Sequence, residues 1–204
     1  MTYRVKKIVW LVASLPFIMA FETPIPVSIQ ASSTISLKGT STLHDFECST
    51  KTIEGTIEID HTGYVFTSAN ISIPVYSLHS SSASMDDNMY DALKAKQYPK
   101  IQFSLLTTDS TQLVRSGTTD SALNLRGNLT IAGKQKLIDL PAYVVKHENG
   151  TITVHGIKKL LMTDFGIDPP TFMLGVLKTG NEVTIEFSLD LKESNSQVHA
   201  IMIK

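Results

Sequence analysis

The chain is poor in cysteine and in charge. Its 204 residues include a single cysteine, Cys48, so no intrachain disulfide can form and the core alone must hold the fold. We expect this thiol to be buried and inert. Charged residues make up 18% of the chain, the formal net charge is -1, and no block of Lys or Arg follows the N-terminus. These values exclude nucleic acid as a partner, because its binding needs a basic surface.

Patterns that mark metal sites and enzymes are also missing. The six histidines show no His-x-x-x-His spacing and no cluster of cysteines or carboxylates accompanies them. No serine has the Gly-x-Ser-x-Gly context of a nucleophile. The sequence Asp164-Phe165-Gly166 lacks the other motifs of a kinase. We therefore expect no catalytic residue, no metal and no cofactor.

The N-terminus has the pattern of a secretory signal peptide. Basic residues at positions 4, 6 and 7 precede an uncharged apolar run over residues 8–21, which is too short to span a bilayer comfortably. Cleavage is expected after Ala20 or near Ala31, and an uncleaved anchor is the alternative. We divide the chain into a signal peptide (1–30), one domain (31–192) and a C-terminal tail (193–204).

Alternation of apolar and polar residues predicts antiparallel strands. The clearest covers residues 182–191, where the apolar side chains fall on every second position. Further strands are expected at 35–39, 43–48, 52–60, 64–66, 69–78, 101–105, 123–131, 137–146 and 151–161. Residues 109–120 are predicted to form a hairpin loop. The short connections imply antiparallel pairing throughout.

One helix is predicted over residues 85–95. Ser84 and Asp87 have capping-box spacing, and Met85, Met89 and Leu93 form an apolar stripe that is typical of a core-facing helix. Strands with one helix leave a choice between a closed barrel and a two-sheet sandwich. Long strands and Gly127 at an inward position favour a closed antiparallel β-barrel of about eight strands.

Residues 163–175 are predicted to form an apolar loop. Pro169 and Pro170 remove ladder donors, so this segment cannot be an ordinary strand. Its large apolar side chains must be covered, either beneath the sheet or on a bound apolar partner. We expect the loop to lie near one mouth of the barrel, where residues 164–175 would act as a gate.

Four motifs occur in a recognisable order. They are Gly39-Thr40-Ser41-Thr42-Leu43-His44-Asp45-Phe46, Tyr98-Pro99-Lys100-Ile101-Gln102-Phe103, Leu125-Arg126-Gly127-Asn128-Leu129-Thr130-Ile131-Ala132-Gly133 and Asp164-Phe165-Gly166-Ile167. In this order they resemble the YceI-like family of bacterial exported lipid-binding proteins, over roughly residues 34–191. The resemblance implies a lipocalin-like barrel that holds a polyisoprenoid or similar long-chain lipid and has no catalytic residues.

The resulting expectation is a periplasmic or secreted binding protein, with a long-chain lipid as ligand and transient contact with a membrane. The ligand-binding residues are predicted to be the inward apolar set and the loop: Ile101, Phe103, Leu105, Leu123, Leu125, Leu129, Ile131, Phe165, Phe172, Met173, Leu174, Val183, Ile185, Phe187 and Leu189. The same side chains would also serve simply to fill a core. A filled barrel acting through its surface is therefore the alternative function.

Overall fold

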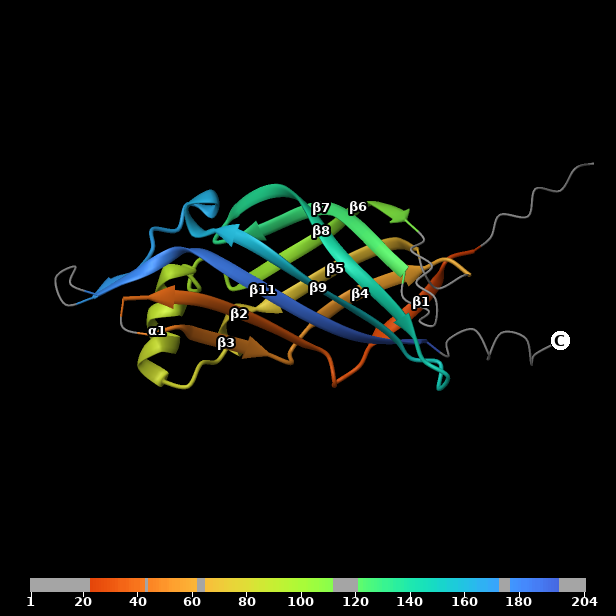
Figure 1. Cartoon of the computed structure of the whole chain (residues 1–204), viewed down its shortest axis with the longest axis horizontal. Helices are drawn as coiled ribbons and strands as arrows, with labels where there is room; N and C mark the ends of the chain where they lie inside the picture. Colours follow the sequence, from red (N-terminus) through yellow and green to blue (C-terminus); the bar gives the residue numbers. More distant parts are fainter. Residues whose placement is uncertain (1–22, 43, 62–64, 112–120, 173–176, 195–204) are drawn as a thin grey trace, which may run out of the picture.

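The computed structural model describes residues 23–42, 44–61, 65–111, 121–172 and 177–194. In chain order its elements are β1 (Ile25–Ile29), β2 (Thr34–Ser41), β3 (Phe46–Thr50), β4 (Glu54–Ile59), β5 (Phe66–Pro74), η1 (Val75–Ser77), α1 (Ala83–Ala92), β6 (Lys100–Thr111), β7 (Ser121–Ile131), β8 (Lys134–Lys146), β9 (Ile152–Leu161), η2 (Met162–Phe165), β10 (Thr171–Phe172) and β11 (Leu177–Glu193). Figure 1 shows an elongated barrel with α1 at one end.

Eight strands close the barrel. The order β1-β4-β5-β6-β7-β8-β9-β11 returns to β1 because β11 pairs with β1 at its C-terminal end, and every pairing is antiparallel. Nearer its N-terminal end, β11 pairs with β2 instead of β1, and β2 in turn pairs with β3. An isolated bridge between Ser49 and His79 then joins β3 to the segment after β5. The predicted antiparallel barrel is confirmed.

Side chains at the barrel end that contains β1 form a packed core cluster. This cluster joins side chains from β1, β4, β5, β7, β8, β9 and β11, and Val144 and Leu191 in it have no exposed surface. A second cluster lies toward α1, where Leu93, Leu160, Phe165 and Val183 are buried. One end of the barrel is thus closed by side chains, and the site lies between this plug and α1.

The helix differs from its predicted bounds. It spans Ala83–Ala92 and not residues 85–95, with Ser82 as the N-cap residue and no side-chain capping bond. Ser84 therefore lies inside the helix, so the predicted capping box is wrong. Asp86 instead accepts hydrogen bonds from the backbone N–H and the hydroxyl of Ser80, which hold the pKa of that carboxyl below its usual range. The helix ends at Ala92, before the predicted end at residue 95, and Leu93 is its C-cap residue.

Three strands extend beyond the predicted pattern. β6 runs to Thr111, so residues 109–111 of the predicted hairpin loop are strand, and residues 112–120 of that loop lie outside the described residues. β1 was not anticipated, because Ile25–Ile29 lies in the segment assigned to the signal peptide. β11 begins at Leu177, five residues earlier than expected, and its first residues pair with the short β10 inside the predicted loop. The predicted apolar loop over residues 163–175 therefore contains a short strand, β10, which begins directly after Pro169 and Pro170.

Gly127 has the predicted inward position and a specific reason for it. It pairs with Leu105 on β6, and the register shifts by one residue next to this pair, so that Leu106 points outward. A Cβ at Gly127 would lie 2.6 Å from Cζ of Phe103 and 2.6 Å from the carbonyl oxygen of Ser104. The glycine thus makes room for an aromatic ring at a bulged bend of the wall.

Candidate functional site: an apolar cavity inside the barrel

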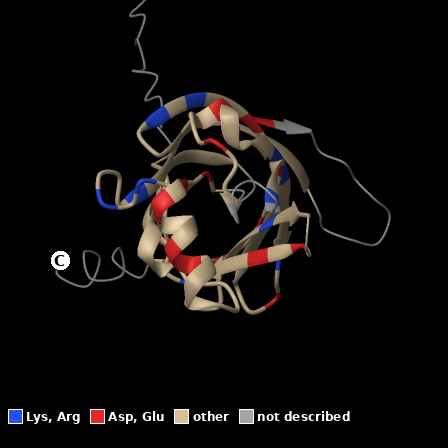
Figure 2. Cartoon of the chain, turned by 90° about the vertical axis from the view of Figure 1, so that its left-hand side faces the viewer, with Lys and Arg blue, Asp and Glu red and all other residues tan. Residues whose placement is uncertain are grey.

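A cavity of about 520 Å³ occupies the barrel between the packed end and α1. This volume lies within the range of roughly 300 to 1,000 Å³ that is usual for small-molecule sites. Inward side chains of the strands line most of it, and Met85 and Met89 of α1 and its C-cap residue Leu93 also line it. Figure 2 looks into the barrel from the end where α1 lies. An apolar interior of this size offers a dry environment for a hydrocarbon chain.

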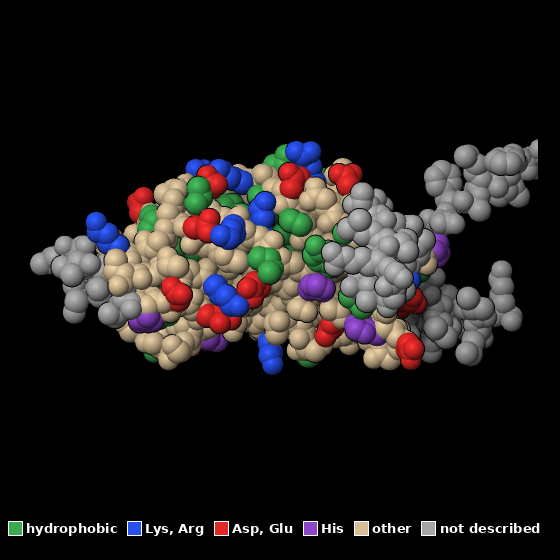
Figure 3. Space-filling view, viewed as in Figure 1, with side chains coloured by type: hydrophobic (Ala, Val, Ile, Leu, Met, Phe, Trp, Pro, Cys, Tyr) green, Lys and Arg blue, Asp and Glu red, His purple; other side chains and the backbone are tan. Residues whose placement is uncertain are grey.

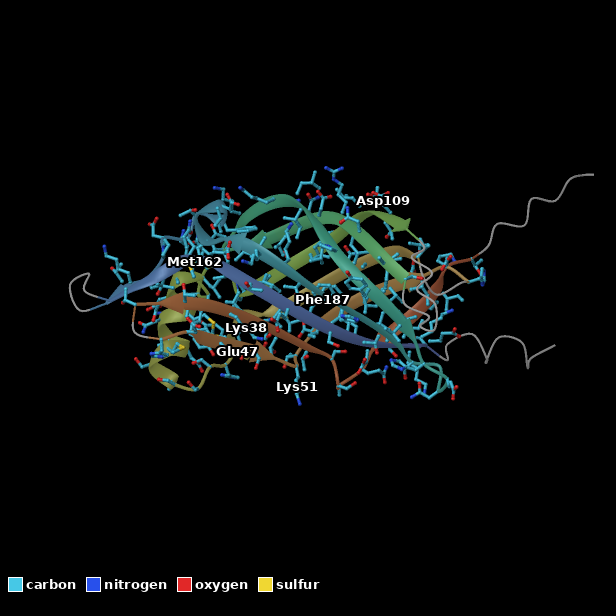
Figure 4. The ribbon with its side chains drawn as sticks, viewed as in Figure 1. Lys38, Glu47, Lys51, Asp109, Met162 and Phe187 are labelled. Carbon is cyan, nitrogen blue, oxygen red and sulfur yellow. The ribbon has the colours of Figure 1, made fainter. Side chains whose placement is uncertain are left out.

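Two phenylalanines lie against the wall of the cavity over glycines. Phe103 on β6 lies over Gly127 of β7, and Phe187 on β11 lies over Gly156 of β9. A Cβ at Gly156 would lie 2.7 Å from Cζ of Phe187, so only glycine allows this approach. Figure 4 shows Phe187 near the middle of the barrel. Because the rings rest on bare backbone, they occupy less of the interior than rings on a full side-chain layer would.

Eleven of the predicted ligand-binding residues line the cavity. They are Ile101, Phe103, Leu105, Leu125, Leu129, Ile131, Phe165, Val183, Ile185, Phe187 and Leu189. Leu123 is buried in the core of the packed end and is not part of the lining. Met173, Leu174 and the side chain of Phe172 lie outside the described residues. Contact of the eleven with a ligand stays a prediction.

The sequence pattern missed a second group of lining residues. Ile71 and Ile73 of β5, Ile35 and Leu37 of β2, Phe46 of β3, and Ile138 and Leu140 of β8 also face the cavity. Their alternation was visible, but alternation does not reveal which strands surround open space and which surround packed core. The missed lining residues also include Lys158, a charged side chain in the otherwise apolar inward row of β9.

The rim near α1 is polar. Polar lining residues at this end are Ser41 at the end of β2, His44 in the β2–β3 connection, Ser82 just before α1, Asn88 in α1 and Lys178 of β11. Figure 4 places Met162, the first residue of η2, at the same end of the barrel. A polar rim around an apolar interior suits a ligand with a polar end and a long apolar body.

The first part of the predicted gate is core. Phe165 is 3% exposed and Ile167 is 7% exposed, and both belong to the cluster that contains Leu160 and Val183. η2 is also fixed to the wall by an ion pair of 2.8 Å between Lys136 and Asp164. These contacts make Phe165 a structural residue that also touches the cavity. A gating role for residues 172–174 stays a prediction.

Cys48 is buried and lines the cavity from β3. It is 1% exposed, and burial raises the pKa of its thiol to about 11. At neutral pH such a thiol is protonated and is a poor nucleophile.

Neither a metal centre nor a membrane-spanning helix is found in the described part of the chain. No three His, Cys, Asp or Glu side chains there gather closely enough to hold an ion. No helix there is both long and apolar enough to cross a membrane.

The fold and the cavity together define a closed antiparallel barrel with an apolar interior, the architecture of lipocalin-type proteins. The model of the YceI-like domain matches residues 28–191. The chain belongs to the YceI-like family.

Several solved structures have a similar fold. BcnA from Burkholderia cenocepacia superposes with a TM-score of 0.65 at 21% identity, over 80% of this chain and 99% of that one. A domain from Saccharophagus degradans, described as a polyisoprenoid binding domain implicated in plant cell wall breakdown, gives 0.63 at 14% identity, over 83% and 99%. The YceI protein of Campylobacter jejuni gives 0.58 at 21% identity, over 72% and 85%. The comparison with curated proteins finds no match.

Proposed function

We propose that this chain is an exported binding protein that holds a long-chain apolar lipid, a polyisoprenoid or a similar molecule, inside its barrel for carriage or storage. The observation that carries the proposal is the apolar cavity of about 520 Å³ behind the polar rim. The similarity to a domain described as polyisoprenoid binding supports the choice of ligand class. No catalytic step is part of the proposal.

The expected affinity is high enough for the ligand to survive purification. A large ligand gains about 0.3 kcal/mol per heavy atom, so a chain of roughly 40 carbons would reach about 12 kcal/mol, which corresponds to nanomolar binding. Native protein extracted into organic solvent should therefore release a lipid in about equimolar amount, detected by mass spectrometry. Protein that carries no lipid and takes up none when offered it would end the proposal.

Export is proposed from the leader, and β1 constrains where the leader would be cleaved. Val27 and Ile29 pair with β11 and β1 also pairs with β4, so removal of residues up to Ala31 would open the barrel. Cleavage after Ala20 would leave β1 in place. We therefore favour the earlier site, and N-terminal sequencing of the exported protein tests it.

The alternative is a barrel that acts through its outer surface. Large apolar side chains are exposed on the outside of β8 and β9, where Leu137, Tyr143, Ile157 and Leu161 are 42% to 59% exposed. Figure 3 shows apolar side chains on this face separated by charged ones. Because the interior contains open space and the outer apolar residues are interrupted, the binding role is the better supported of the two.

A further inference from the structure

Lys158 places a charge on the inner face of the barrel. In β9 the residues on either side of it in the inward row, Gly156 and Leu160, are buried, and Lys158 has the same parity. Its register partner on β11 is Ile185, which also lines the cavity. Opposite residues of an antiparallel pair lie on the same face of the sheet, so the side chain of Lys158 starts inward and borders the cavity.

The positive charge has no protein counter-charge in the described chain. Other lysines around this end form ion pairs on the outer surface: Lys38 with Glu186 at 2.6 Å and Lys159 with Glu182 at 2.8 Å. No hydrogen bond or ion pair joins Lys158 to another described residue. Among the described residues that line the cavity there is no Asp or Glu, and the only lysines are Lys158 and Lys178.

An ammonium group in such surroundings favours an anion. It is a point charge with three donors, and its attraction to a carboxylate or phosphate is stronger beside apolar walls than in water. Lys158 also lies on the side of the cavity toward η2, away from the packed end where Val144 and Leu191 lie. A ligand could therefore bury its chain beside Phe187 while its polar end meets this lysine.

We propose that the ligand is an amphiphile with an acidic group, a carboxylate or a phosphate, which binds the ammonium group of Lys158 while its hydrocarbon chain fills the cavity. This proposal rests on the proposed function, since it names the chemical class of the lipid. It also assigns Lys158 as the residue that distinguishes acidic lipids from neutral ones.

The test compares three probes of equal chain length on delipidated protein: hexadecanoate, hexadecyl phosphate and 1-hexadecanol. Lys158→Met removes the charge and keeps an unbranched side chain that is only one heavy atom shorter. Lys159→Met is the matched control, because this neighbouring lysine points outward and pairs with Glu182. A hydrogen bond between two charged groups is strong enough that Lys158→Met should weaken binding of at least one acidic probe about 10- to 100-fold. Binding of 1-hexadecanol should be unchanged or tighter.

The outcomes separate this inference from the function on which it rests. Lys159→Met should bind all three probes as the wild type does, and the acidic probe with the larger loss in Lys158→Met identifies carboxylate or phosphate as the group. The role of Lys158 is overturned if Lys158→Met binds both acids as tightly as the wild type does. It is also overturned if the substitution weakens the binding of 1-hexadecanol by the same factor as the binding of the acids. In both cases lipid binding stands. If the wild type binds none of the probes and retains no native lipid, the proposed function fails too.

Discussion

The ring of Phe187 on β11 lies directly over the backbone of Gly156 on β9. The two residues are register partners, and a Cβ at Gly156 would lie 2.7 Å from Cζ of the ring. The same Cβ would also collide with the carbonyl oxygen of Pro141 on β8. A missing side chain on one strand thus sets the position of an aromatic ring on the next, and with it the open volume of the cavity.

Gly156→Ala should destabilise the protein and reduce its capacity for lipid. Overpacking of this kind costs about 1 to 3 kcal/mol, because the ring or the backbone of β8 must move. Urea denaturation measures the loss, and solvent extraction measures the bound lipid. Unchanged stability together with full lipid content would contradict the packing described for Phe187.

Gly39 and Phe46 offer a cleaner version of the same test. The nearest atoms to a Cβ at Gly39 all belong to the Phe46 side chain, with Cε1 at 2.7 Å. Gly39→Ala should therefore cost less in a Phe46→Leu background than in the wild type. A double-mutant cycle should give a coupling energy of about 0.5 to 3 kcal/mol. A coupling energy of zero would show that the two residues do not meet.

Phe165→Ala should behave as a core substitution. Phe165 is 3% exposed within the cluster near α1, so its truncation should cost about 3 to 5 kcal/mol of unfolding free energy. Leu137→Ala is the control, because Leu137 is 53% exposed on β8 and its loss should cost less than about 1 kcal/mol. A loss at Phe165 no greater than that at Leu137, with faster lipid exchange, would instead make Phe165 part of a gate.

The buried thiol of Cys48 predicts a loss of stability at high pH. In the unfolded chain the thiol ionises near its ordinary pKa of 9.0, whereas burial raises the folded pKa to about 11. The unfolded state therefore releases its proton first, and the contribution of the thiol to stability declines as pH rises from 9 toward 11. Cys48→Ala should lose less stability than the wild type across this window. Parallel curves for the two proteins would show that the thiol is not shielded from water.

Asp190 predicts the opposite dependence at low pH. Hydrogen bonds from Ser32 at 2.6 Å and Thr153 at 2.7 Å lower the pKa of its carboxyl and join the β1–β2 corner to β9 and β11. The stabilisation is present above the ordinary pKa of 3.8 and is lost as pH falls through the lower folded value. Asp190→Asn should cost about 1 to 2 kcal/mol at neutral pH and much less near pH 2. An equal cost at both pH values would rule out this linkage.

Much of the barrel could be predicted from alternation alone. The inward row of β11, including Val183, Ile185 and Phe187, follows directly from the polar residues between them. The strand β1 was missed because its short apolar sequence follows the apolar run over residues 8–21 and was assigned with that run to a predicted signal peptide. The contact of Phe103 with Gly127 depends on the register of β6 and β7, which a local pattern does not specify.

The candidate site was predictable only in part, for a physical reason. Period-two patterning identifies inward residues, but whether they enclose a cavity depends on strand number, on glycine positions and on how far the plug near Leu191 extends. Lys158 was passed over because a charged residue inside an apolar row looks like an interruption of the pattern. In the folded barrel it is the charged group of β9 on the cavity wall.

A crystal structure of the protein, purified without delipidation, tests the central claim most directly. The account predicts one elongated density inside the barrel, in contact with Phe103 and Phe187, with its polar end at Lys158. An interior filled by these rings and their neighbours, or a lipid bound only to the outer face of β8 and β9, would contradict it.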